Sequence, residues 1–142
     1  KLRLLALLAY VLPTFPLGYF WHLTIFADHY RQLAVYRENI AIPLGVASML
    51  IQGWIWAILY ERLFAGNSVL PGALKFASLA APLAWSFMVV AVAAKHHMTS
   101  VGGYLAIETA FIATHYAIVS PLIALVYSNT PATSPPTAST EI

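Results

Sequence analysis

The sequence predicts an all-α integral membrane protein whose main part is a bundle of four transmembrane helices. Of the 142 residues, 61% are hydrophobic and 8% are charged, whereas a soluble domain carries roughly a quarter charged residues. The mean hydropathy is +0.77. The charged side chains gather in short clusters, and the stretches between them are long enough for the roughly 20 residues that cross a bilayer core. This pattern excludes a water-soluble globule.

Clusters of charge divide the chain into four expected spans. The first span ends before Asp28, the second against Glu61, and the third at Lys95, while Gly102 and Gly103 open the fourth. Each uncharged stretch crosses a bilayer as a helix that rises about 1.5 Å per residue. The expected bounds are residues 4–27, 40–60, 76–94 and 101–127, which together form a transmembrane domain at residues 1–127.

Two segments outside the expected spans differ in composition from the rest. Gly66, Asn67, Pro71 and Gly72 are residue types that favour turns, so they predict a turn-rich link between the second and third spans. Residues 128–142 are rich in Pro, Thr and Ser and have no apolar face. We therefore expect an extended, low-complexity C-terminal tail.

The distribution of basic residues predicts the orientation of the bundle. Four spans place both termini on one side of the bilayer, and the side with more Lys and Arg in its short loops faces the cytoplasm. The terminal side holds four such residues and the opposite side three, namely Lys1, Arg3, Arg62 and Lys75 against Arg31, Arg37 and Lys95. We therefore expect the termini in the cytoplasm of a multi-pass protein.

Composition and motifs also exclude several functions. The chain has no cysteine, which rules out a disulfide framework, a thiolate metal site and an iron–sulfur cluster. Its seven basic residues are scattered and form no stripe, so nucleic acid is not an expected partner. The sequence contains no phosphate-binding loop, no Ser-His-Asp order and no zinc-protease motif. We accordingly do not expect an enzyme.

Polar residues inside the expected spans are the best indication of a site. An ionisable group at membrane depth costs roughly 2.5–3.5 kcal/mol on insertion scales and usually faces a partner or a cavity. Glu108 and His115 lie seven residues apart on one face of the fourth span, about 10 Å from each other. Ser48 and Gln52 form an i,i+4 pair in the second span, and His22 lies near the far end of the first.

Depth along the spans predicts which of these residues meet. Measured from the side opposite the termini, His22 and Glu108 lie about 6 and 10 Å deep, and Gln52 and His115 about 18 and 21 Å deep. We therefore expect one contact between His22 and Glu108 and another between Gln52 and His115. All five histidines belong to the same half of the molecule, because the residues just outside the spans on that side are Asp28, His29, His96 and His97.

Four interpretations of this polar half remain open. The buried residues hold neighbouring helices in register through hydrogen bonds. Alternatively, Asp28, His29, His96 and His97 bind a metal ion, since they offer suitable nitrogen and oxygen ligands. A haem on a single histidine is a third interpretation, because about 15 Å between His22 and His115 is too far for one haem to bridge them. In the fourth, Glu108, Gln52 and His115 mark a path for protons or small solutes.

Small residues predict where the third span packs. Its sequence is rich in alanine, and a face of small residues permits close contact between helices. We expect Ser78 and Pro82 on that packing face, with Ser48 as a packing residue of the second span.

Short motifs in the first half of the chain resemble a known kind of protein. Gly18-Tyr19-Phe20-Trp21-His22, then Asp28-His29-Tyr30, then Gln52-Gly53 are similar to small four-helix bacterial integral membrane proteins of uncharacterised function. The resemblance covers about the first 65 residues. It implies a four-helix fold in the bacterial inner membrane, and it implies no catalytic activity.

Together these observations predict a small structural or accessory subunit of a larger bacterial membrane complex, of the respiratory, photosynthetic or membrane monooxygenase type. The expected partners are the lipid bilayer and other membrane subunits. One alternative is a stand-alone carrier or channel for protons, metal ions or small solutes. Another is a membrane redox protein that binds haem or a metal.

Overall fold

A computed structural model describes residues 1–130, and within them every regular element is helical. The expected tail therefore lies outside the described residues, apart from a turn at residues 128–130. The elements are α1 (Leu2–Phe20), η1 (Trp21–Ile25), α2 (Ala27–Leu33), α3 (Ile42–Leu63), α4 (Val69–Trp85), η2 (Ser86–Val90), α5 (Ala91–Ala93) and α6 (Val101–Tyr127). The two elements labelled η are single π turns, and each continues an α-helix.

Four helical stretches of the described chain are long and apolar enough to cross a membrane, which is the number that the sequence predicts. They are Leu2–Ile25, Ile42–Leu63, Val69–Ala93 and Val101–Tyr127. The expected link between the second and third spans is too long, because Pro71 and Gly72 belong to the first turn of α4. Proline is tolerated there, since the N–H that it lacks has no partner within the helix at that position.

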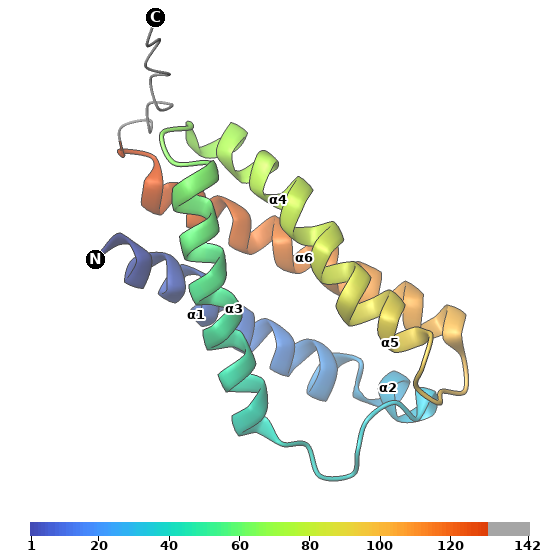
Figure 1. The fold of residues 1–142 in the computed structure, drawn as a ribbon. Coiled ribbons are helices and arrows are strands. Elements are labelled where there is room, and N and C mark those ends of the chain that lie inside the picture. The colour runs from blue at the N-terminus through green and yellow to red at the C-terminus, as the bar shows by residue number, and fades with distance from the viewer. Residues whose placement is uncertain (131–142) are drawn as a thin grey trace, which may run out of the picture.

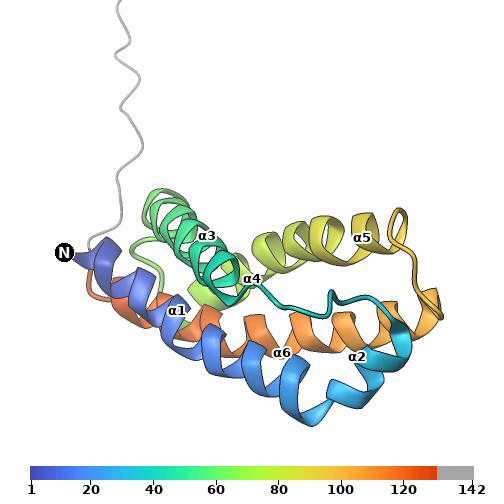
Figure 2. The same ribbon diagram turned by 90° about the horizontal axis from the view of Figure 1, so that it is seen from below.

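The helices pack as two antiparallel neighbours of α6 with a fourth helix laid across them. Figures 1 and 2 show α1 and α4 alongside α6, whereas α3 crosses α1 steeply. The start of α1 and the end of α6 lie together at one end of the bundle, which we call the terminal end. The opposite end carries the connecting segments 34–41 and 94–100, and we call it the loop end.

The crossing of α1 and α3 is close because α3 has a glycine at the contact. A β-carbon on Gly53 would lie 2.8 Å from Leu7 Cδ1 and 2.9 Å from Tyr10 Cδ1, closer than real β-carbons approach other atoms. Glycine removes this obstacle, as small residues do at close helix contacts in membranes. The close approach brings Gln52 on α3 within hydrogen-bonding distance of Tyr10 on α1.

Aromatic side chains fill the core at the terminal end. Tyr60 stacks on Tyr127 with ring centroids 5.2 Å apart, and Phe76 meets Tyr60 edge-on at 5.5 Å. Trp56 adds a further edge-on contact with Phe76 at 5.6 Å. The hydroxyl of Tyr127 donates a hydrogen bond of 3.1 Å to the backbone carbonyl of Ala57. This cluster packs α3, α4 and α6 together.

The packing face of α4 differs from the one expected. Ser78 and Pro82 are exposed, and the hydroxyl of Ser78 bonds the carbonyl of Lys75 in its own helix. Ser48 on α3 is exposed as well. The buried residues of α4 are Gly72, Ala73, Phe76 and Ala80, which share one face of the helix. The prediction rested on the many small residues of the third span, which do not show which side of the helix is buried. That side is set by Phe76, which packs into the aromatic cluster.

Candidate functional site

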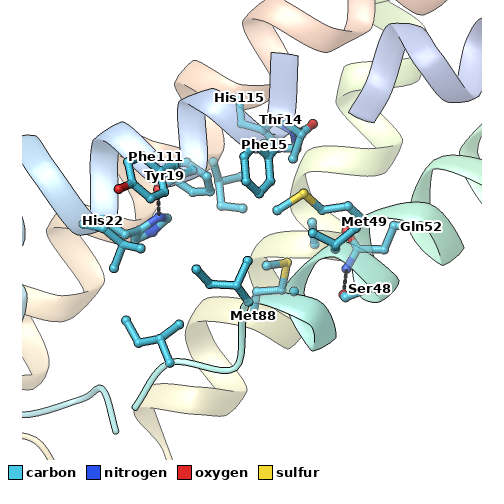
Figure 3. A pocket seen from close by; sticks show the side chains of 18 of the residues that line it. Thr14, Phe15, Tyr19, His22, Ser48, Met49, Gln52, Met88, Phe111 and His115 are labelled. Carbon is cyan, nitrogen blue, oxygen red and sulfur yellow. Dashed lines mark hydrogen bonds between the residues drawn. The ribbon is translucent and has the colours of Figure 1, made fainter. Parts of the chain in front are cut away.

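A cavity of about 670 Å³ lies between α1, η1, α3 and α6 toward the loop end. Figure 3 shows Thr14, Phe15, Tyr19 and His22 of the first span on one side, facing Ser48, Met49 and Gln52 of α3. Met88 of η2 and residues of the segment 34–41, including Tyr36 and Arg37, complete the wall. Most of the lining is apolar or aromatic. The steep crossing of α3 produces the cavity. From Gly53 back to the start of α3, residues 42–52 diverge from α1 and leave a space between the two helices.

Three residues of the predicted polar stripe line this cavity, namely His22, Gln52 and His115. The fourth, Glu108, is buried on α6 and contacts His22. The cavity thus brings together residues from three different spans. Sequence spacing predicted that these residues share one half of the bundle, and the structure shows that they border a common space.

The expected contact between His22 and Glu108 is present, with 3.3 Å between Nε2 and Oε1. The hydroxyl of Tyr30 donates a hydrogen bond of 2.8 Å to the same carboxylate oxygen. On its other side the imidazole of His22 places Nδ1 2.9 Å from the carbonyl of Gly18. A carbonyl only accepts, so Nδ1 carries a hydrogen. His22 Nε2 therefore faces the Glu108 carboxyl group, and the two form an ion pair when the ring is protonated.

Tyr30 lies on α2, outside the spans, and is 1% exposed. Burial raises the pKa of the Tyr30 phenol, and the neighbouring Glu108 carboxylate raises it further. Both causes favour the neutral phenol, which is the form that donates to Glu108. Through this bond α2 and α6 are tied together at the loop end.

The expected contact between Gln52 and His115 is wrong, because Tyr10 lies between them. The Tyr10 hydroxyl donates a hydrogen bond of 2.8 Å to Gln52 Oε1, and its ring meets the His115 ring edge-on at 5.4 Å. His115 instead places Nε2 2.8 Å from the hydroxyl oxygen of Thr14. The estimated depths correctly predicted that Gln52 and His115 lie at the same level of the bundle. They could not predict that the phenol of Tyr10 extends from α1 into the space between them.

Sequence reasoning therefore missed Tyr10, Thr14 and Tyr30. A signal for the first two was present, because Tyr10, Thr14, Gly18 and His22 recur at every fourth position of the first span. Residues at that spacing share one face of a helix. No comparable pattern identifies Tyr30, which lies on α2 after the break at Phe26.

The predicted metal site is not assembled. Residues 1–130 contain no group of three or more His, Asp or Glu side chains that could hold a metal ion. Asp28 forms an ion pair of 2.6 Å with Arg31 on its own helix, and His29, His96 and His97 are exposed. Proximity to the same end of the bundle did not make these side chains converge, because they belong to α2 and to the segment 94–100.

Of the two histidines inside the spans, His22 has both ring nitrogens engaged and His115 has one engaged. Both ring nitrogens of His22 are engaged, by Gly18 and by Glu108, so neither is free to bind iron. His115 uses Nε2 for its contact with Thr14. The arrangement can form hydrogen bonds to a guest molecule in the cavity.

No family model, curated protein or solved structure matches this chain. The resemblance to small four-helix bacterial membrane proteins therefore stays a prediction.

Proposed function

We propose that this chain is a multi-pass membrane protein that binds an amphipathic small molecule in the cavity between α1, α3 and α6. The observation that carries this proposal is the cavity itself, about 670 Å³ of mainly apolar and aromatic lining with a few polar groups. Small-molecule sites in proteins are typically clefts of about 300–1,000 Å³ with this composition, and they lie between helices in helical bundles. The polar groups come from three spans and converge on one space, which suits a ligand with one polar end.

The cavity favours a binding role over a channel. Its lining residues lie from Tyr10 toward the loop end, while Tyr60, Phe76 and Tyr127 fill the core at the terminal end. Within residues 1–130, the packed rings stand where a continuous pore would have to pass. A ligand that enters from the loop end or from the bilayer would stop at this cluster.

Glycines offer a matched pair of variants to test the proposal. Gly18 lines the cavity and Gly102 does not, and a β-carbon on either would meet nothing within 4 Å. Gly18→Trp should therefore fill the cavity, whereas Gly102→Trp adds the same side chain elsewhere. The protein is purified in mild detergent, and the small molecules that it retains are extracted and identified by mass spectrometry.

We expect one species enriched over the surrounding membrane in the wild type and in Gly102→Trp, and absent from Gly18→Trp. Equal amounts of ordinary bulk lipid on all three proteins would overturn the proposal, because the cavity would then be a surface groove that any acyl chain fills.

The same preparation tests the accessory-subunit hypothesis, which remains a prediction. Stoichiometric foreign subunits in the extracted complex would support a role in a larger bacterial membrane assembly. The cavity would then be the place where such an assembly holds its small molecule.

We propose the bacterial inner membrane as the location, with the termini in the cytoplasm. The chain has no cysteine, so the reactivity of a single introduced thiol shows on which side of the membrane that residue lies. His97→Cys at the loop end should react with an impermeant maleimide on intact spheroplasts. Ser128→Cys at the terminal end should react only after lysis, and the reverse result would invert the proposed orientation.

A further inference from the structure

The hydrogen bonds around Thr14 determine which nitrogen of His115 carries the hydrogen. The Thr14 hydroxyl has one hydrogen and donates it to the backbone carbonyl of Tyr10, which only accepts. Its oxygen must therefore accept the bond from His115, whose Nε2 lies 2.8 Å away. His115 Nε2 is accordingly the N–H nitrogen of the neutral ring, and Nδ1 is left with a lone pair that can only accept.

That lone pair has no partner among residues 1–130. The fully enclosed side-chain atoms of these residues that lack a partner are Trp21 Nε1, Trp56 Nε1, Tyr60 Oη and Ser120 Oγ. His115 Nδ1 does not belong to this group, so it keeps some open surface, although the whole residue is only 4% exposed. His115 lines the cavity, which offers space for a partner of Nδ1.

The residues around His115 indicate the chemical character of a molecule that could bind to Nδ1. Phe111 stacks on the His115 ring at 5.8 Å with planes 7° apart, and Tyr10 and Tyr116 meet its edges. These are apolar, aromatic walls. The cationic side chain on the cavity lining is Arg37, which lies on the segment 34–41 at the loop end. No described cation lies beside His115 to attract an anionic head group.

We infer that the ligand of this cavity is an uncharged amphipathic alcohol or phenol, whose hydroxyl donates a hydrogen bond to His115 Nδ1. This inference rests on the proposed binding function and names the ligand class of the same site. Thr14 acts as a positioning residue, because it holds His115 in the form whose free nitrogen accepts. An ether or a hydrocarbon of the same shape leaves that nitrogen unpaired and binds more weakly.

Two probes with the same apolar body test the inference, para-nonylphenol and para-nonylanisole. They differ in a methyl group on the oxygen, which removes the hydrogen that the phenol donates. Binding to the purified protein in lipid nanodiscs is measured by titration calorimetry. For the wild type we expect the phenol to bind about tenfold more tightly than the anisole, the effect of about one hydrogen bond.

Variants of the two residues remove this preference in different ways. His115→Phe keeps a stacked ring without an acceptor, so both probes should bind with the weaker affinity. Thr14→Val frees His115 to place its hydrogen on either nitrogen, and the preference for the phenol should fall. His97→Gln changes an exposed histidine of the segment 94–100 and should keep the wild-type preference, which makes it the matched control.

A second measurement needs no variant and remains decisive if one of them fails to fold. In nitrogen NMR of the wild type with labelled histidine, the phenol should shift the Nδ1 resonance of His115 and the anisole should not. Equal binding of both probes would overturn the inference and leave the proposed function standing. If neither probe binds, and no molecule is retained during purification, the proposed function itself fails.

The source of the natural ligand follows from the same preparation. A hydroxyl-bearing lipid would be retained by protein extracted from membranes, whereas a soluble phenol or alcohol would be absent after purification and would bind on addition. Either result supports the inference, since both share the donor that His115 accepts. Retention of a lipid without any hydroxyl or N–H donor at this site would contradict it.

Discussion

The imidazole Nε2 of His22 lies 3.3 Å from the carboxylate oxygen Oε1 of Glu108 at the loop end of the bundle. The pair joins η1 to α6, and Tyr30 adds α2 by donating to the same oxygen. Glu108 is 6% exposed, so its carboxyl group has the Tyr30 hydroxyl as a donor and the His22 imidazole as a neighbour in place of water.

Breaking the pair should destabilise the protein strongly. Removing one partner of a buried ion pair typically costs about 3–5 kcal/mol, because the other is left unpaired. We expect a loss of this size for Glu108→Ala, and a double variant with His22→Ala that loses about 1–3 kcal/mol less than the sum of the two single changes. The unfolding free energy is measured by titrating folded protein in micelles with a denaturing detergent.

The ion pair of Arg3 and Glu61 at the terminal end is the matched control. Its side chains are 44% and 35% exposed, and an exposed pair is worth about 0–1 kcal/mol. A coupling at His22 and Glu108 no larger than that of the control would contradict a tightly coupled internal pair.

The contact at Gly53 predicts a large effect of a single methyl group. Gly53→Ala places a β-carbon 2.8 Å from Leu7 and 2.9 Å from Tyr10, so α3 must move away from α1. Overpacking of this kind costs about 1–3 kcal/mol. Gly45→Ala changes the same helix where nothing lies within 4 Å, and it should cause no loss of unfolding free energy. Equal stability of the two variants would show that the crossing is looser than the structure describes.

The contact between Gly72 and Tyr60 predicts that a destabilising substitution at Gly72 is compensated by a second substitution at Tyr60. A β-carbon on Gly72 would clash with the hydroxyl oxygen of Tyr60 but would lie 3.5 Å from Cζ of the same ring. Gly72→Ala alone should therefore cost about 1–3 kcal/mol. Tyr60→Phe removes the hydroxyl, which is buried without a partner in residues 1–130, so the double variant should recover most of the loss. Additive losses in the double variant would count against the clash.

The raised pKa of Tyr30 predicts how stability depends on pH. An ordinary tyrosine ionises near pH 10, and burial keeps the Tyr30 phenol neutral in the folded protein at that pH. Its contribution to stability is therefore complete below about pH 10 and is lost as the pH rises above that value, because only the unfolded state releases the proton. Tyr30→Phe should show a smaller decline in unfolding free energy above pH 10 than the wild type.

A spectroscopic measurement tests the same point directly. Phenolate absorbance during an alkaline titration should differ between the wild type and Tyr30→Phe only above pH 10. Replacement of Glu108 by Gln should move the titration of Tyr30 to lower pH, since the carboxylate is the second cause of the raised pKa. A Tyr30 phenol that titrates at its ordinary value would refute its burial against Glu108.

Spacing of charges was enough to predict the four spans, and depth was enough to predict the contact of His22 with Glu108. Both arguments use only the rise of a helix and the thickness of a bilayer. The partner of His115 required more, because a phenol on α1 intervenes and its position depends on the close crossing at Gly53. The predicted metal ligands do not converge within residues 1–130 for a related reason: a shared end of the bundle does not make side chains on separate elements point toward one another.

The two π turns affect which residues share a face of each helix. Phe26 donates to the carbonyl of Trp21 and Ala91 to that of Ser86, each bond spanning five residues instead of four. A π turn accommodates one residue more than an α turn, so the stretches before and after it are out of phase on a helical wheel. Deleting one residue from η1 would restore the phase and rotate everything before or after it by about 100°. The cavity wall at His22 thus lies on a turn that holds one extra residue. A helical wheel drawn straight through Trp21 assigns the wrong neighbours to one half of the span.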